Sequence, residues 1–126
     1  MSKIIVAGGR EFTDSELVEE VMENLFLVWS EEDAKWLDSD LHEVVCGEAR
    51  GADTLGRLWA ESQSVKVKSF PADWDAHGRA AGPIRNAEMG DYADTLVAFW
   101  DGKSKGTKNM IDYSLKKGLT VHVYRY

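Results

Sequence analysis

The sequence predicts an α/β protein with a single Rossmann-like, doubly wound domain. Five short apolar or alternating segments are separated by segments in which apolar residues recur at helical spacing. This alternation is typical of a mostly parallel sheet with helices on both faces. Glycine-rich loops follow three of the five strand-like segments. Because crossovers between parallel strands are right-handed, few topologies remain, and we expect a five-stranded sheet in the order 3-2-1-4-5.

Length and composition agree with this fold class. The chain has 126 residues, of which 44% are hydrophobic, enough for the core of one domain covering residues 1–126. The single cysteine, Cys46, cannot form an internal disulfide, and we expect a buried, inert thiol in a reducing compartment. No apolar run approaches the ~20 residues of a membrane span, and we find no signal peptide. We therefore expect a cytoplasmic protein with no membrane partner.

The formal net charge of the chain is −7. Proteins that bind the nucleic-acid backbone usually carry a basic face, so the charge argues against a nucleic-acid partner. It does not argue against a small anionic ligand that is held by local donors.

The first predicted strand and helix occupy the amino-terminal third of the chain. Residues 3–7 form the first predicted strand, and its continuous apolar run from Ile4 to Ala7 is typical of a strand that is buried on both faces. Thr13 opens a Thr-Asp-Ser-Glu capping box, and apolar residues then follow a 3.6-residue period as far as Trp29. We expect this helix to restart through residues 30–33 and to end at residues 38–40.

The next predicted elements are a buried strand, a helix and an edge strand. Residues 43–46 form the second predicted strand, which is apolar at residues 44–46, and a glycine-rich segment follows it. Leu55, Leu58 and Trp59 then mark a helix by their spacing. Residues 65–70 alternate between apolar and polar side chains, which predicts a strand with one exposed face at an edge of the sheet.

The carboxyl-terminal half predicts two further strand and helix pairs. A long polar segment precedes a helix over residues 84–92, and residues 95–100 form an apolar strand. A polar loop leads into a helix that begins near Thr107 and has Gly118 as its C-cap. Residues 119–124 form the fifth strand.

The glycine-rich loops follow strands 1, 2 and 4, which are neighbours in the expected sheet. They are Gly8-Gly9-Arg10, residues 47–53 and residues 102–107. Ligands of such sheets bind beyond the carboxyl ends of the strands, where the strand order reverses, and helix N-termini there attract anions. Each glycine could instead serve only a tight turn. The three loops together predict a small, phosphate-bearing ligand.

Four segments, in this order along the chain, carry a resemblance to a known family: Gly8-Gly9-Arg10 with Phe12, residues 47–53, Asp73-Trp74 with Gly82 and Arg85-Asn86, and Phe99-Trp100-Asp101-Gly102 with Ser104-Lys105-Gly106-Thr107. The pattern resembles the small YspA/YpsA-type branch of the SLOG superfamily of bacteria and their phages. That superfamily joins the Smf/DprA DNA-processing proteins to the LOG-type phosphoribohydrolases that activate cytokinins. The resemblance implies a Rossmann-like fold that binds nucleotides or nucleotide-derived ligands.

The sequence departs from the hydrolase pattern that this resemblance brings with it. LOG-type hydrolases carry a Gly-Gly-x-Gly-Thr-x-x-Glu signature with a catalytic acid, and Met110 stands where that acid would be. Asn86 replaces the lysine of their Arg-Lys pair. N-glycosidic cleavage needs a positioned carboxylate to stabilise positive charge on the sugar, and Asp101, Asp53 and Glu48 are the remaining candidates. We interpret Asp101 rather as a ribose hydroxyl acceptor or a loop cap.

The candidate site residues lie on these loops and on the segment after the third strand. Catalytic candidates, should the protein be an enzyme, are Asp101, Glu48 and Arg85. Trp74 has two open roles, stacking on a base or anchoring its loop. We expect no metal site and no cofactor. The predicted ligand-binding residues are Gly8, Gly9, Arg10, Gly47, Gly51, Ala52, Asp53, Trp74, Arg79, Arg85, Asn86, Asp101, Gly102, Ser104, Gly106 and Thr107.

Three functions remain open at this point. The first is binding, for sensing or sequestration, of a nucleotide or nucleotide-derived ligand. The second is an N-glycosidic hydrolase or transferase that acts on nucleotides, and the third is a DNA-processing factor of the Smf/DprA kind. The missing acid favours binding. Five tryptophans are many for one core, so we also expect a homo-oligomer with Trp36 at its interface.

Overall fold

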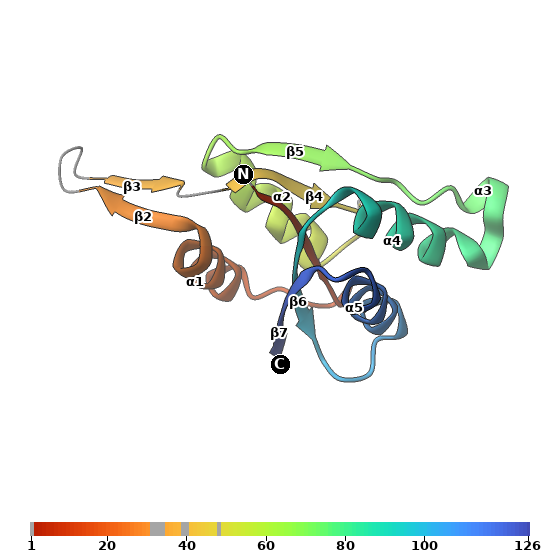
Figure 1. The fold of residues 1–126 in the computed structure, drawn as a ribbon. Helices are drawn as coiled ribbons and strands as arrows, with labels where there is room; N and C mark the ends of the chain where they lie inside the picture. Colours follow the sequence, from red (N-terminus) through yellow and green to blue (C-terminus); the bar gives the residue numbers. More distant parts are fainter. Residues whose placement is uncertain (1, 31–34, 39–40, 48) are drawn as a thin grey trace.

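The computed structural model describes residues 2–30, 35–38, 41–47 and 49–126, with side chains for 3–25, 43–47 and 49–126. A parallel sheet of five strands forms its centre (Figure 1), in the order β5-β4-β1-β6-β7. This is the predicted order 3-2-1-4-5. The strands are β1 (Ser2–Gly8), β4 (Leu41–Cys46), β5 (Lys66–Ser69), β6 (Thr95–Trp100) and β7 (Thr120–Arg125).

Two helices cover each face of the sheet. Helices α1 (Ser15–Phe26) and α2 (Ala52–Ser62) pack on one face. Helices α4 (Ala81–Tyr92) and α5 (Lys105–Lys117) pack on the other. The doubly wound prediction is therefore confirmed. In the described part of the chain, none of the helices combines the length and the apolar character that crossing a membrane requires.

Strand β1 divides the core into two layers. Ile4 and Val6 belong to the cluster under α1 and α2, whereas Ile5 and Ala7 belong to the cluster under α4 and α5. Successive side chains of a strand point to opposite faces, so a strand between two helical layers must be apolar at every position. The continuous apolar run at residues 4–7 predicted this burial.

The ends of the helices refine the predictions. Asp14, not Thr13, caps α1, because its Oδ1 accepts the N–H of Leu17 at 3.0 Å. Ser104 is the N-cap of α5, and Gly118 is its C-cap with a left-handed φ of +81°. The polar segment before α4 contains a short helix, α3 (Trp74–His77), and a 3-10 turn.

The segment after α1 contradicts the sequence prediction. Instead of a continued helix, the chain forms an antiparallel hairpin of β2 (Leu27–Ser30) and β3 (Lys35–Asp38), in which Trp29 pairs with Trp36. The hairpin extends from the end of α1 away from the main sheet (Figure 1). The predicted interface role of Trp36 concerns a side chain outside the described ones and stays a prediction.

Candidate ligand cavity

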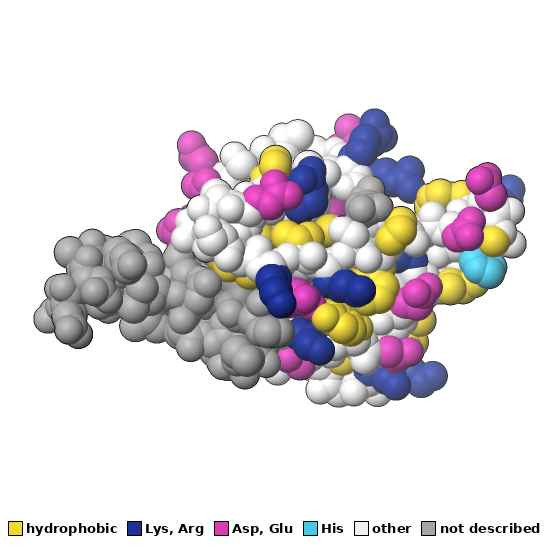
Figure 2. All heavy atoms as spheres, turned by 90° about the horizontal axis from the view of Figure 1, so that it is seen from above, with side chains coloured by type: hydrophobic (Ala, Val, Ile, Leu, Met, Phe, Trp, Pro, Cys, Tyr) yellow, Lys and Arg dark blue, Asp and Glu magenta, His cyan; other side chains and the backbone are white. Residues whose placement is uncertain are grey.

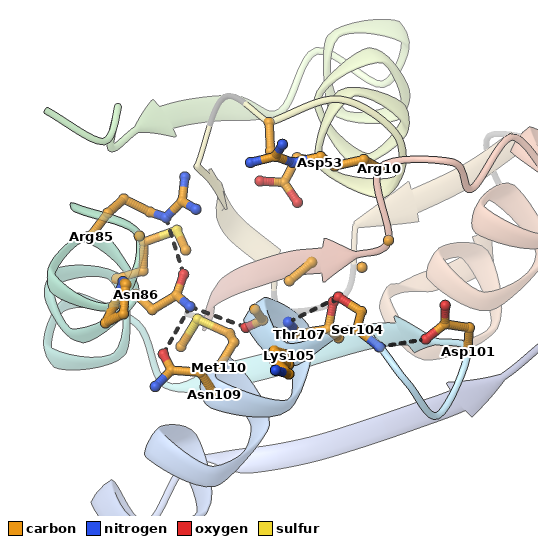
Figure 3. A pocket seen from close by; sticks show the side chains of 18 of the residues that line it. Arg10, Asp53, Arg85, Asn86, Asp101, Ser104, Lys105, Thr107, Asn109 and Met110 are labelled. Atoms are coloured by element: carbon orange, nitrogen blue, oxygen red, sulfur yellow. Dashed lines mark hydrogen bonds between the residues drawn. The ribbon is translucent and has the colours of Figure 1, made fainter. Parts of the chain in front are cut away.

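A cavity of about 660 Å³ opens beyond the carboxyl ends of β1 and β6, the two strands between which the strand order reverses. In Figure 3, Ser104, Lys105 and Thr107 lie at the start of α5, and Arg85 extends from α4. The cavity wall brings together eleven of the predicted binding residues: Gly8, Gly9, Arg10, Asp53, Trp74, Arg85, Asn86, Asp101, Ser104, Gly106 and Thr107.

Gly51 and Ala52 lie behind this wall and shape the loop after β1. The N–H of Ala52 donates to the carbonyl of Gly9 at 3.4 Å. Gly51 has a φ of +77°, and a Cβ there would lie 2.1 Å from the same carbonyl oxygen. Only glycine accommodates both this conformation and this close approach. Gly51 therefore allows the loops after β1 and β4 to pack together.

The other predicted residues are not in the cavity wall. Gly47 faces Arg85, and a Cβ there would lie 2.4 Å from Nη1 of that arginine. Gly102, with a φ of +85°, faces Arg125, and Arg79 is exposed in the turn after α3. Glu48, a catalytic candidate, lies outside the described residues.

Hydrogen bonds hold the loop after β6 in place. Oδ1 of Asp101 accepts the N–H groups of Lys103 and Ser104, both at 2.8 Å. The indole N–H of Trp100 donates to the carbonyl of Ser104 at 3.1 Å. The bonds from Ser104 and then Lys103 lower the pKa of Asp101 below its usual range, because they stabilise the carboxylate. Asp101 thus caps the loop and is a weak base.

The start of α5 presents an anion-binding geometry. Thr107 donates its N–H to Oγ of Ser104 at 3.4 Å, whereas the N–H groups of Lys105 and Gly106 have no acceptor among the described residues. Nothing lies within 4 Å of a Cβ built at Gly106. Free N–H groups and the positive end of the helix dipole attract anions. The N–H of Gly9, predicted to act in the same way, already donates to Phe99 at 3.4 Å.

Asn86 joins α4 to the start of α5. Its Nδ2 donates to the carbonyl of Gly106 at 3.2 Å and to Oδ1 of Asn109 at 3.0 Å, and its Oδ1 accepts from Nε of Arg85 at 3.0 Å. Both amide hydrogens are therefore used, and the side chain is buried. Asn86 lines the cavity and also positions Arg85 and Gly106, and its predicted contact with a ligand stays a prediction.

Asp53 is the buried acid of the cavity. Its side chain is 5% exposed, and Oδ2 accepts the N–H of Gly47 at 3.1 Å. Burial raises the pKa of Asp53 from 3.8 to about 6, against the opposing effects of the Arg85 charge and the Gly47 hydrogen bond. Its carboxyl is thus able to exchange a proton near neutral pH. Among the described residues, no group of three His, Cys, Asp or Glu side chains is arranged to hold a metal ion.

Sequence reasoning missed four polar residues of the wall, Glu11, Lys105, Asn109 and Tyr126. Asn109 lies one helical turn after Lys105, so helical spacing would have placed both on one side of α5. Tyr126 follows β7, next to the end of β6, and its ring lies 4.6 Å from that of Phe12. Burial and then the charge of Asp101 raise the pKa of Tyr126. The position of Tyr126 directly after the fifth predicted strand is the signal by which sequence reasoning could have placed it at the site.

Comparison with known proteins identifies the family. Residues 2–77 match the YspA, cpYpsA-related SLOG family. The chain is also 37% identical to the Gene 61 protein of Mycobacterium phage D29 over 108 residues, which cover 75% of this chain and 86% of that protein. The chain belongs to the YspA, cpYpsA-related SLOG family. The resemblance deduced from the four segments is therefore confirmed.

A solved structure extends the comparison of this SLOG protein to the whole fold. DNA processing protein A (DprA) from Streptococcus pneumoniae superposes with a TM-score of 0.72 over 98% of this chain, at 17% sequence identity. The SLOG chain spans 50% of that protein's length. At this identity, the likeness shows that both share the Rossmann-like fold.

Proposed function

We propose that this SLOG-family protein binds a nucleotide or nucleotide-derived ligand in the cavity over β1 and β6, and releases it unchanged. The observation that carries the proposal is the start of α5. Lys105 and Gly106 line the cavity next to the hydroxyls of Ser104 and Thr107, and their N–H groups have no acceptor among the described residues. A phosphate seated there would accept several hydrogen bonds from a pre-formed site.

The remaining wall suits the rest of a nucleotide. Trp74 is 51% exposed at the rim, so its ring is available to stack on a base. Apolar side chains such as Met89 and Met110 line the floor together with the backbone of Gly8. An apolar cavity with a few convergent polar groups is the usual form of a small-molecule site.

Binding without turnover is favoured because the cavity lacks a carboxylate at the expected position. Met110 is buried where the LOG-type pattern has its acid. Asp101 is engaged by two backbone N–H groups, and its lowered pKa makes it a weak proton acceptor. Glycosidic cleavage needs a group that stabilises positive charge on the sugar or activates water.

The binding test is calorimetric titration of the protein with the four common nucleoside 5′-monophosphates. We expect at least one to bind, and Lys105→Ala and Gly106→Val to weaken it about tenfold or more, the loss expected for a charge-assisted phosphate contact. Lys108→Ala is the matched control, since Lys108 is paired with Asp112 at 2.7 Å outside the cavity. If none of the four binds, or if Lys108→Ala weakens binding as much as Lys105→Ala, the proposal is wrong.

One observation favours hydrolysis as a second candidate. Asp53 is a buried carboxyl in the cavity wall with a pKa of about 6, which suits a general acid near neutral pH. Incubation with the same nucleotides, followed by chromatography for free base, tests this alternative. Release of base by the native protein that disappears in Asp53→Asn would replace the binding proposal with a hydrolase.

The DNA-processing alternative rests on the fold likeness to DprA alone. The net charge of −7 opposes it, and the face drawn in Figure 2 carries acidic and basic side chains intermingled over its described part. Salt-dependent binding of single-stranded or duplex DNA would favour this alternative.

A further inference from the structure

A second cavity adjoins the first and has a different character. It has a volume of about 380 Å³ and lies between the loop after β4 and the segment after β5. Arg10, Ala49, Trp74 and Arg85 line both cavities, so the two are neighbours. The proposed nucleotide site occupies the first cavity, and nothing in its argument uses the second.

Three arginines, Arg10, Arg50 and Arg85, line this second cavity, and its described lining residues include no acid. This concentration of positive charge stands out in a chain with a net charge of −7. Like charges held close together repel one another, and an anion between them would relieve that repulsion. Arginine is also the side chain best suited to bidentate contacts with phosphate.

The arginines have hydrogen-bonding capacity to spare. Arg85 uses Nη1 for the carbonyl of Gly47 and Nε for Asn86, so part of its guanidinium has no partner among the described residues. Among the described residues, Arg50 has only a long pairing with Glu11, at 3.8 Å, between two side chains that are 78% and 92% exposed. Such an exposed pair contributes little. It would yield readily to a phosphate.

We propose that the second cavity binds a second phosphate of the same ligand. The ligand class is then a nucleotide with two separated phosphate groups, one at the start of α5 and the other among the three arginines. Nucleoside 3′,5′-bisphosphates and linear dinucleotides meet this description, with Trp74 between the two sites. This inference rests on the proposed nucleotide site, because the first phosphate positions the second.

The test compares three ligands for each of the four bases: the 5′-monophosphate, the 5′-triphosphate and the 3′,5′-bisphosphate. The triphosphate controls for total charge, since its phosphates are adjacent. We expect the bisphosphate to bind about tenfold tighter than the other two, as one additional charge-assisted contact allows. Arg50→Ala should abolish this difference and leave monophosphate binding unchanged.

Arg57→Ala is the matched control for charge, because Arg57 pairs with Glu61 at 2.9 Å on α2, outside both cavities. Thermal melting verifies that each variant is folded, and Arg50→Lys should recover part of the preference. If monophosphates bind but bisphosphates bind no tighter, or if Arg57→Ala removes the preference equally, the inference is wrong and the nucleotide site stands. If no ligand binds, both are wrong.

Discussion

The glycines after β1 and β4 and the glycine at the start of α5 were all predicted to cradle phosphate, but the structure uses them in two different ways. A Cβ at Gly8 or Gly51 would lie 2.5 Å or less from a backbone oxygen, whereas a Cβ at Gly106 would meet nothing within 4 Å. Gly8 and Gly51 allow neighbouring segments of the chain to pack closely against each other. Gly106 instead lines the cavity.

This difference separates two reasons for a glycine that look identical in a sequence. A tightly packed glycine is needed for the fold, because any side chain at that position would overlap neighbouring atoms. A glycine beside open space costs helical stability, and a ligand that approaches the backbone would compensate for that cost. Replacement of glycine by alanine should therefore lower the free energy of unfolding in the packed region and raise it at the start of α5.

Gly51→Ala should lower the free energy of unfolding by about 4 kcal/mol, since it combines a disfavoured backbone conformation with an overlap in a packed loop. Its φ is +77°, and the new Cβ would lie 2.1 Å from the carbonyl oxygen of Gly9. Urea denaturation measures the loss. Gly118→Ala is the control, because Gly118 has a φ of +81° but open space around it, and should lose only about 1 kcal/mol. Equal losses in the two variants would mean that loop packing is unimportant.

Asp53, in the packed region, should give the protein a pH-dependent stability. Because burial raises its pKa from 3.8 to about 6, the folded state holds more protons than the unfolded state between these values. The free energy of unfolding therefore falls by ~3 kcal/mol in total as the pH rises through this window. Above the window it no longer changes with the ionisation of Asp53. Asp53→Asn should match the native protein near pH 4 and exceed its stability at pH 7. A constant difference across this range would contradict the prediction.

Asn86→Leu should lower the free energy of unfolding by about 2 kcal/mol, because it removes the three hydrogen bonds of a buried side chain. It loses the contacts to Arg85 and to the carbonyl of Gly106. Asn109→Leu removes only one of these bonds, at an exposed position, and should change stability by less than ~0.5 kcal/mol. Thermal melting compares the two. Similar losses would show that the network does not join the regions.

Gly106→Ala should raise the free energy of unfolding by about 0.5 kcal/mol, the small gain expected when alanine replaces glycine in a helix. Open space around Gly106 means that the methyl group meets no protein atom. Chemical denaturation measures the gain. A loss of stability would indicate that Gly106 serves the fold, as Gly51 does, and would remove the distinction between the two regions.

The sequence predicted the sheet because its signals are local. A strand buried on both faces, such as β1, has consecutive apolar residues over its buried part. This pattern can be recognised in the sequence without knowledge of the neighbouring strands. The hairpin after α1 was missed because Val28 and Trp29 fit the helical period of the preceding residues, while strand pairing with residues 35–38 is a contact between segments. A short apolar run fits either structure.

The sequence predicted which loops form the cavity wall, but it did not predict what each residue in those loops contacts. Spacing and glycine content placed Gly8, Gly51 and Gly106 near one edge of the sheet. Whether a glycine faces a neighbour or a cavity depends on tertiary contacts, such as that between Gly51 and Gly9. The burial of Asp53 and the connections of Asn86 depend on such contacts too.

Tyr126 links the completion of the cavity wall to the order in which the chain is synthesised. The loop at Gly8 leaves the ribosome early, because synthesis proceeds from the amino terminus. The wall beside it is complete only when β7 has paired with β6 and Tyr126 has packed against Phe12. A nascent chain in which β7 has not yet paired with β6 therefore lacks part of the cavity wall.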